Sequence, residues 1–348
     1  MSAWHQTLST RAACPLCGSV EYDPLPASGR NLYSEQLAVV LGAAELELLE
    51  YLQNLACTGC GLHYKRRWFA PAQLHALFNH SVATHPKGWD VISGRFSAQS
   101  FASELASLSL AAAANDRLSM ARYQRALISV LDSMPRLEGS QLLRDCLAAI
   151  ARTDVPFLQQ VSQQLAAHFD QPYPFKRFSG FAASELWTWW EAKLGVIRSY
   201  AEVGCPLWGQ LRRADGTCQK TYLRREEANY WGQSCVQQGR SCVAALSDCT
   251  SVSAGDWDQP GAQRFDLLGA FQYLDHLEDP LGFVTEALAR SRALCLILDA
   301  AHAPVAIQHY TGWSARPIAW LAQHFNLRWC DDFAPIRASG NVAYLLHP

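Results

Sequence analysis

Residues 199–211, with the sequence SYAEVGCPLWGQL, decide the fold of this chain. A short run of strand-forming residues, 200–203, leads into Gly204, and a tight turn over 205–209 precedes the start of a helix at Gln210. Glycines in such a turn let the backbone approach a ligand closely, and the first N–H groups of the helix are free to bind it. This stretch therefore predicts the opening of a βαβ unit with a nucleotide-type binding turn.

Strand and helix patterns alternate over the rest of the chain. Strands are expected at 200–203, 221–225, 241–246, 265–270 and 293–298, helices at 228–238, 281–290 and 315–324, and a terminal hairpin of 327–330 with 342–346. The alternation predicts a parallel, doubly wound α/β sheet. Ligands bind such sheets beyond the carboxyl ends of the strands, so the polar residues that end strands are the candidates. These are Glu202, Gly204, Glu226, Asp248 and the loop 271–276.

Two CxxC-Gly motifs mark a metal-binding module in the N-terminal part. They contain Cys14 and Cys17, then Cys57 and Cys60. Four thiolates in two such pairs are the tetrahedral ligand set of a structural zinc ion, and a closed set leaves no open position for catalysis. A redox dithiol is the weaker interpretation, because neither pair opens a helix near a βαβ pattern.

The stretches beside and after this module show no chemistry. The basic cluster of Lys65, Arg66 and Arg67 predicts a solvated face, with a phosphate contact as the minority alternative. From 97 to 166, apolar residues at spacings of three and four predict amphipathic helices, with turns near 115–116, 139–140 and 154–156. A tryptophan-rich helix over 186–195 is expected to pack in a core.

Composition narrows the classes of function. The formal net charge is −2 and 17% of residues are charged, which argues against a general electrostatic grip on nucleic acid or an anionic membrane. No apolar run reaches the ~18 residues of a membrane span. The N-terminal residues lack the apolar core of a secretion signal, so a reducing, cytoplasmic location is expected.

Four stretches of the C-terminal half resemble motifs of class I S-adenosylmethionine-dependent methyltransferases. They are AEVGCPLWG, LRREEANYWGQSCVQQG, VAALSDC and FDLLGAFQYLDHLEDPLGFVTEAL. With the CxxCG…CxxCGL module in front, the whole layout resembles the zinc-ribbon methyltransferases that include deoxysugar C-methyltransferases. The resemblance implies a zinc-binding module at 1–78, a helical insert and linker at 79–180, and a Rossmann-like methyltransferase domain at 181–348.

The resemblance also implies roles for individual residues. S-adenosylmethionine would be held by residues of the first motif, a ribose-binding acid, an adenine-contacting acid and the start of the loop after the fourth strand. These are Glu202, Gly204, Cys205, Gly209, Glu226 (with Glu227 as the neighbouring choice), Asp248 and Phe271. In the sugar methyltransferases, a Tyr-x-Glu-His stretch after the fourth strand lies beside the sugar, and its histidine is the candidate base. The matching residues here are Tyr273, Asp275 and His276.

The implied function is methyl transfer to a small acceptor, a nucleotide-linked sugar or a polysaccharide precursor. The turn departs from the family pattern, because Pro206 stands where the family has its next glycine and Trp208 follows. The alternative is therefore a catalytically inactive protein of the same fold that serves as a binding or scaffold subunit, with the helical insert as a surface for a protein partner. A nucleic-acid methyltransferase is a third class, and the acidic balance argues against it. For the Asp275–His276 pair, the competing interpretation is a cap of the helix that starts near residue 281.

Overall fold

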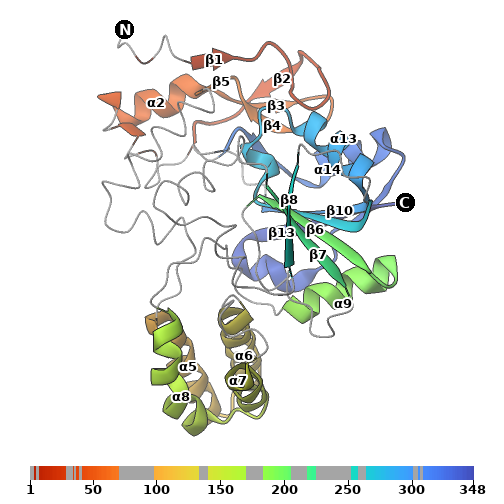
Figure 1. The fold of residues 1–348 in the computed structure, drawn as a ribbon. Helices are drawn as coiled ribbons and strands as arrows, with labels where there is room; N and C mark the ends of the chain where they lie inside the picture. The colour runs from red at the N-terminus through yellow and green to blue at the C-terminus, as the bar shows by residue number, and fades with distance from the viewer. Residues whose placement is uncertain are drawn as a thin grey trace.

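A seven-stranded sheet organises the C-terminal half of the chain (Figure 1). The computed structural model describes residues 4, 8–28, 34, 37–38, 41–69, 98–132, 140–169, 183–204, 218–224, 252–257, 264–300, 305 and 309–348. The strands of this sheet are β6 (Ser199–Gly204), β7 (Gln219–Arg224), β8 (Val252–Asp256), β9 (Phe265–Phe271), β10 (Ser291–Asp299), β12 (Arg328–Cys330) and β13 (Asn341–His347). Their spatial order is β12-β13-β10-β9-β6-β7-β8.

The order of the strands reverses beside β6. The chain first adds β7 and β8 in parallel on one side of β6, and then returns to place β9 and β10 in parallel on the other side. β13 runs antiparallel to β10 and β12. A sheet with such a reversal is doubly wound, and its ligand crevice lies where the order reverses, here between the carboxyl ends of β6 and β9.

Most of the expected elements of the sheet are confirmed. β6, β7, β9, β10 and the β12–β13 hairpin fall on the expected segments, and so do α13 (Pro280–Arg290) and α14 (Ala315–His324). The expected strand at 241–246 and helix at 228–238 lie outside the described residues. The strand that pairs with β7 is β8, at Val252–Asp256, which was not expected from the sequence.

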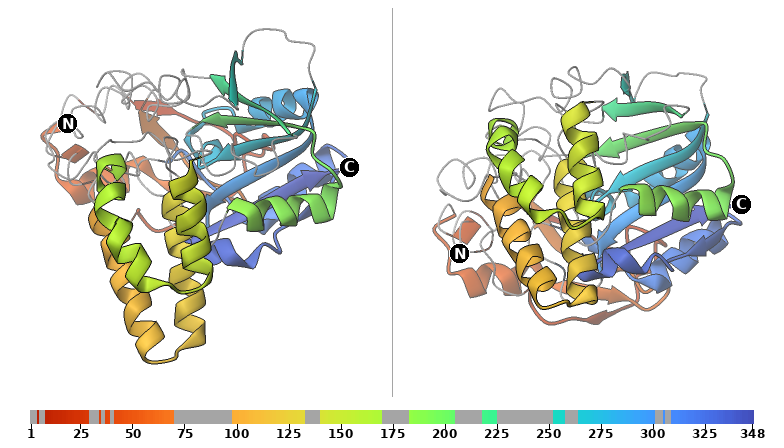
Figure 2. Two further views of the ribbon diagram at one scale, coloured as in Figure 1. Left: turned by 60° about the horizontal axis from the view of Figure 1, so that its bottom comes forward. Right: turned by 90° about the horizontal axis from the view of Figure 1, so that it is seen from below.

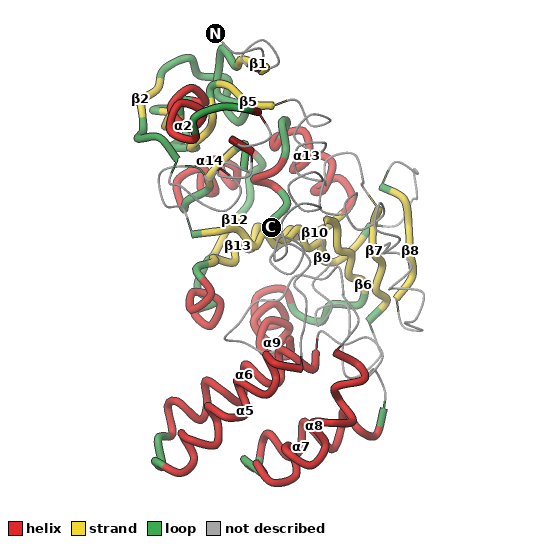
Figure 3. Tube along the Cα trace, turned by 90° about the vertical axis from the view of Figure 1, so that its left-hand side faces the viewer, coloured by secondary structure: helices red, strands yellow, loops and turns green. Residues whose placement is uncertain are grey.

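Each face of the sheet has its own core (Figure 3). On one face, α13, α14 and the N-terminal module pack against residues of β6, β9 and β10. The opposite face is covered by α9 (Ala183–Leu194) and the 3-10 helix η5 (Ala334–Ser339). In α9, the buried rings of Trp187 and Trp190 lie 5.3 and 5.4 Å from the ring of Tyr200, so these tryptophans pack in a core as expected.

The N-terminal module contains short strands and one described helix. Its elements are β1 (Leu8–Thr10), β2 (Tyr22–Pro24), α2 (Glu45–Leu52), β3 (Asn54–Cys57), β4 (His63–Lys65) and β5 (Arg67–Phe69). β11 (Thr311–Gly312), which follows β10 in the chain, pairs with β4 and completes a four-stranded sheet of order β11-β4-β3-β2. A strand from the range 181–348 therefore belongs to the sheet of the range 1–78.

Four helices form a bundle beside the large sheet (Figure 2). They are α5 (Ala98–Ala113), α6 (Arg117–Asp132), α7 (Gln141–Ala151) and α8 (Val155–Phe169), and they share one apolar core. Asp116, Ser140 and Asp154 accept hydrogen bonds from backbone N–H groups of the first turns of α6, α7 and α8. The helices expected between 97 and 166 are thus confirmed, as are the turns near 115–116 and 154–156, and a residue suited to cap the next helix precedes each of α6, α7 and α8. Of the turn expected near 139–140, only Ser140 lies within the described residues.

No helix in the described part of the chain combines the length and the apolar character that crossing a bilayer requires.

The central strand β9 tolerates no side chain at Gly269. A Cβ atom placed there would lie 2.6 Å from the hydroxyl of Tyr200 and 2.6 Å from the ring of Phe271. We expect Gly269→Ala to lower the free energy of unfolding by about 1–3 kcal/mol, because the rings must shift in a packed core. Urea unfolding measures this. In the Tyr200→Phe background the same substitution should cost less, and equal stability of Gly269→Ala and wild type would contradict the close approach.

Candidate functional site

The switch point brings the ends of β6 and β9 together. In the register of the two strands, Gly204 lies opposite Phe271, so both strands end at the same edge of the sheet. The side chain of Phe271 is buried in the core beside α9. Of the residues expected near a cofactor, the structure thus places Gly204 and the backbone of Phe271 at this edge.

Glu202 lies in the core of the sheet, two residues before the end of β6. Its side chain is 0% exposed, and the hydroxyl of Tyr200 donates a hydrogen bond of 2.7 Å to its Oε2 atom. Burial, followed by the neighbouring Glu202, raises the pKa of Tyr200 well above its usual value. The carboxylate of Glu202 is therefore buried in the core and does not lie at the carboxyl end of β6.

The remaining expected cofactor residues, Cys205, Gly209, Glu226 and Asp248, lie outside the described residues. Within the described residues, β8 ends at Asp256, which lies opposite Arg224 of β7 at the same edge of the sheet. Sequence reasoning missed β8 because its segment, VSAGD, consists mainly of small residues, which give little strand signal. The acidic residue after Gly255 was the feature that could have indicated the end of a strand.

Gln272 joins the ends of three strands. It follows β9 with a left-handed φ of 44°, and its N–H donates to the carbonyl of Ile297 on β10 at 2.6 Å. Its side-chain amide donates to Asp299 at the end of β10 and to Asn341 at the start of β13. A non-glycine residue in this conformation costs free energy and is often found at functional sites.

The 3-10 helix η4 (Leu274–His276) carries Asp275 and His276, Tyr273 directly precedes it, and all three expected catalytic residues are buried. Oδ1 of Asp275 lies 3.9 Å from Nε2 of His276, which is too long for a hydrogen bond. Tyr273 packs edge-on against Phe283 of α13, with ring centroids 5.2 Å apart. The helix-cap alternative is wrong, because Asp279 caps α13 by accepting from the N–H of Gly282 at 2.8 Å.

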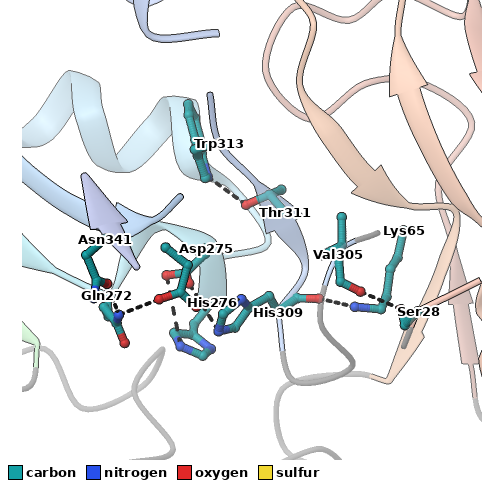
Figure 4. A network of polar contacts seen from close by, with 11 residues as sticks. Ser28, Lys65, Gln272, Asp275, His276, Val305, His309, Thr311, Trp313 and Asn341 are labelled. Carbon is teal, nitrogen blue, oxygen red and sulfur yellow. Dashed lines mark hydrogen bonds and ion pairs between the residues drawn. The ribbon is translucent and has the colours of Figure 1, made fainter. Parts of the chain in front are cut away.

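His309 completes this site, and sequence reasoning missed it. Its Nε2 atom lies 3.2 Å from Oδ2 of Asp275, and its Nδ1 atom 3.9 Å from Oδ2 of Asp299 (Figure 4). The rings of His309 and His276 are perpendicular, with centroids 4.6 Å apart. Burial lowers the pKa of His309 to about 4. No motif surrounds this histidine in the sequence, so only the fold could reveal it.

The N-terminal module holds the backbone around His309. The N–H of Lys65 donates to the carbonyl of Tyr310 at 3.1 Å, and the N–H of Tyr310 donates to the carbonyl of Asp275 at 2.8 Å. Nζ of Lys65 donates to the carbonyl of His309. Lys65 is only 2% exposed, so the expectation of a solvated face was wrong for this residue. The side chain of Lys65 thus links the N-terminal module directly to the backbone of His309.

The four cysteines come together as the motifs predicted. Sγ of Cys14 lies 3.6 Å from Sγ of Cys60, and Sγ of Cys17 lies 3.4 Å from Sγ of Cys57. The glycine after each second cysteine has a left-handed φ, 73° at residue 18 and 78° at residue 61. The hydrogen bond with Cys60 lowers the pKa of Cys14 to about 5, so the cluster favours a thiolate.

This geometry fits a tetrahedral metal ion. Zn–S bonds of about 2.3 Å place sulfur atoms about 3.8 Å apart, close to the separations in the cluster. All four sulfur atoms lie within 4.8 Å of one another. Four thiolates leave no open position, so the cluster suits a structural role.

Comparisons with known proteins give only remote likenesses. No protein-family model matches the chain, and no curated protein matches it in sequence. Solved structures with similar folds include the N-terminal domain of EvdMO1 in the presence of SAH and D-fucose (13% identity, 47% of this chain, 82% of that chain, TM-score 0.31). N-methyltransferase NodS from Bradyrhizobium japonicum WM9 has 13% identity over 47% of this chain and 92% of its own, with a TM-score of 0.34.

A third solved structure is magnesium protoporphyrin IX methyltransferase (ChlM) from Synechocystis PCC 6803 with bound SAM. Its identity is 12%, over 48% of this chain and 77% of its own, with a TM-score of 0.33. These values are too low to carry an argument about activity. The Rossmann-like, doubly wound fold stated above therefore rests on the strand order of this chain's own sheet.

Loss of one thiolate should remove the metal and loosen the N-terminal module. We expect purified Cys60→Ser protein to hold about one zinc ion fewer per chain than wild type and to unfold at a lower temperature, because the free energy of metal binding contributes to folding. Metal analysis and thermal unfolding measure both effects. Cys146→Ser, in the helical bundle, is the control for zinc content. Equal zinc in Cys60→Ser and wild type would contradict the assignment.

Proposed function

We propose that the chain is an S-adenosylmethionine-dependent methyltransferase that acts on a small acceptor, a nucleotide-linked sugar or a polysaccharide precursor. The observation that carries the proposal is the pairing of β6 with β9 at the switch point, with Gly204 opposite Phe271. Ligands bind doubly wound sheets at this crevice. In this proposal the turn of the first motif would lie beside the loop that carries Asp275 and His276.

The cofactor half of the proposed site follows the carboxyl edge of the sheet. Residues of the first motif (Glu202, Gly204, Cys205 and Gly209) would surround the amino-acid end, Glu226 would bind the ribose, and Phe271 would close the edge. For the acid that contacts adenine, we propose Asp256 beside the expected Asp248, since Asp256 is the residue that ends β8. Bound S-adenosylmethionine would supply an electrophilic methyl group.

The acceptor half of the proposed site is the η4 loop. His276 would take a proton from the carbon next to a ketone of the acceptor. Asp275 would offset the charge gained by the imidazole. The carbon would keep the electron pair and use it to bond to the methyl group, while the sulfur–methyl bond would break with its electrons going to the departing S-adenosylhomocysteine. Tyr273 would border the acceptor. Burial of all these side chains excludes water from the proton transfer.

The four-cysteine cluster would hold a structural zinc ion. Its place in the shared core beneath the large sheet, and the contacts of Lys65 with the segment around His309, support this role. We place the protein in the cytoplasm, where thiols remain reduced and available to the metal. A protein partner on the helical bundle remains a prediction.

Cofactor binding separates an enzyme from an inactive relative. We expect calorimetric titration of zinc-loaded protein with S-adenosylmethionine to give saturable one-site binding. Glu226→Ala should abolish it while the matched Glu227→Ala retains it, because only one acid can reach the ribose. Asp256→Asn compared with Asp248→Asn would show which acid serves the adenine. Absence of binding at millimolar ligand in folded protein would favour the scaffold function and point to the turn with Pro206 and Trp208.

Removal of the proposed base tests the chemical step. We expect His276→Ala to lower the release of S-adenosylhomocysteine, measured with a panel of nucleotide-linked keto sugars, by about 10²–10⁴-fold, because a positioned base contributes that much. The affinity for S-adenosylmethionine should not change. The control is His324→Ala, an exposed histidine at the end of α14. Unchanged turnover in His276→Ala would remove the base assignment.

A further inference from the structure

We propose that Asp275, His276 and His309 form a second metal site, which binds a divalent transition-metal ion such as Zn²⁺. One ligand atom from each residue lies within 4.8 Å of the others. The proposal goes beyond methyl transfer and does not depend on it. No sequence motif suggested this site, because His309 is distant in the sequence from the η4 loop.

The separations between the ligand atoms suit an ion. Metal bonds of about 2.0–2.2 Å to nitrogen and oxygen place neighbouring ligands of a tetrahedral ion about 3.4 Å apart. Nε2 of His309 lies 3.2 Å from Oδ2 of Asp275, and Nε2 of His276 lies 3.9 Å from its Oδ1. Small rotations of the side chains would therefore bring all three atoms to bonding distance of one ion.

The chemistry of the donors selects the class of ion. Two imidazoles and one carboxylate are typical of catalytic zinc sites and of non-haem iron sites, and both leave coordination positions open. Calcium and magnesium prefer sets made of oxygen. The site thus differs in kind from the closed set of four thiolates in the N-terminal module.

Residues around the cluster hold the ligands in place (Figure 4). While one ring nitrogen of His309 faces Asp275, the other faces Oδ2 of Asp299 at 3.9 Å. Asp299 in turn accepts a hydrogen bond from Gln272. A carboxylate behind a ligating histidine is a common feature of metal sites, since it sets the tautomer and the orientation of the ring.

Backbone contacts fix the two segments that meet at the site. The N–H of Tyr310 donates to the carbonyl of Asp275 at 2.8 Å, and Lys65 donates to the carbonyl of His309. Asp275, His276 and His309 are 3%, 4% and 6% exposed. Burying a carboxylate beside two imidazoles is costly, and coordination of a cation is one of the ways in which proteins offset that cost.

The ion and the proposed base exclude each other. A ring nitrogen that binds a metal cannot take a proton, so His276 acts as a base only when the cluster is free of metal. With an ion bound, the open position would take an oxygen of the acceptor, and the ion would lower the pKa of that group. The proposed cofactor half of the site is the same in both cases.

Metal stoichiometry tests the proposal directly. We expect wild-type protein, equilibrated with Zn²⁺ and freed of excess, to hold one ion more per chain than His309→Gln. Cys60→Ser should likewise lose one ion, and the double variant Cys60→Ser/His309→Gln should lose both. His324→Gln is the matched control and should bind as much zinc as wild type. If His309→Gln retains the full zinc content, the second site does not exist.

Cobalt spectroscopy separates the two sites. Co²⁺ bound to thiolates gives strong charge-transfer absorption, whereas Co²⁺ bound to nitrogen and oxygen gives only weak visible bands. We expect His309→Gln to lose the weak component alone and Cys60→Ser to lose the strong one. Asp299→Ala should weaken the affinity of the second site about 10–100-fold, as loss of a carboxylate behind a ligand does. Spectra of His309→Gln identical to those of wild type would overturn the proposal.

Failure of this proposal and failure of the proposed function are distinguishable. Calorimetry with S-adenosylmethionine reports on the cofactor half, and the metal content does not depend on it. Circular dichroism of His309→Gln confirms that the chain is folded when its metal is counted. If His309→Gln is unfolded, His276→Gln and Asp275→Asn replace the other two ligands in the same count, and an unchanged zinc content in those variants would equally reject the site.

Discussion

Parallel pairing of β6 with β9 is the interaction on which the rest of the structure depends. It reverses the strand order and places Gly204 opposite Phe271. Close packing of the two strands favours a glycine at 269, because the hydroxyl of Tyr200 occupies space that a Cβ atom would need. The same hydroxyl donates a hydrogen bond to Glu202. One local arrangement thus satisfies a buried carboxylate, fills the core and brings the carboxyl ends of the two strands together.

A second link joins the N-terminal module to the site. The cysteine cluster fixes the turn between β3 and β4, and β4 pairs with β11, which follows the segment of His309. From there, Tyr310 donates to the carbonyl of Asp275. Because the module and one face of the large sheet share a core, the position of His309 depends on the packing of the module that carries the four cysteines. This is a physical reason why a change at the cysteine cluster would influence a site in another part of the chain.

The sequence predicted what depends on local pattern. Periodicity located the bundle helices and most strands, and the CxxC-Gly motifs located the thiolates. The strand at Val252–Asp256 was missed because its small residues give little strand signal, whereas 241–246 has a stronger one. Burial of Lys65 and the approach of His309 were missed because both arise from the pairing of β4 with β11, which joins segments far apart in the chain. The turn at 205–209 lies outside the described residues, so the proposed roles of its residues remain predictions.

The histidine that lies closest to the carboxylate of Asp275 in the folded protein is not its neighbour in the sequence. The sequence pairs Asp275 with its neighbour His276, yet its carboxylate lies closer to His309, at 3.2 Å compared with 3.9 Å. The backbone carbonyl of Asp275 accepts a hydrogen bond from the N–H of Tyr310, which follows His309 in the chain. This backbone contact brings the carboxylate of Asp275 close to the imidazole of His309 as well as to that of His276. This geometry favours a shared ligand set over a simple acid–histidine pair.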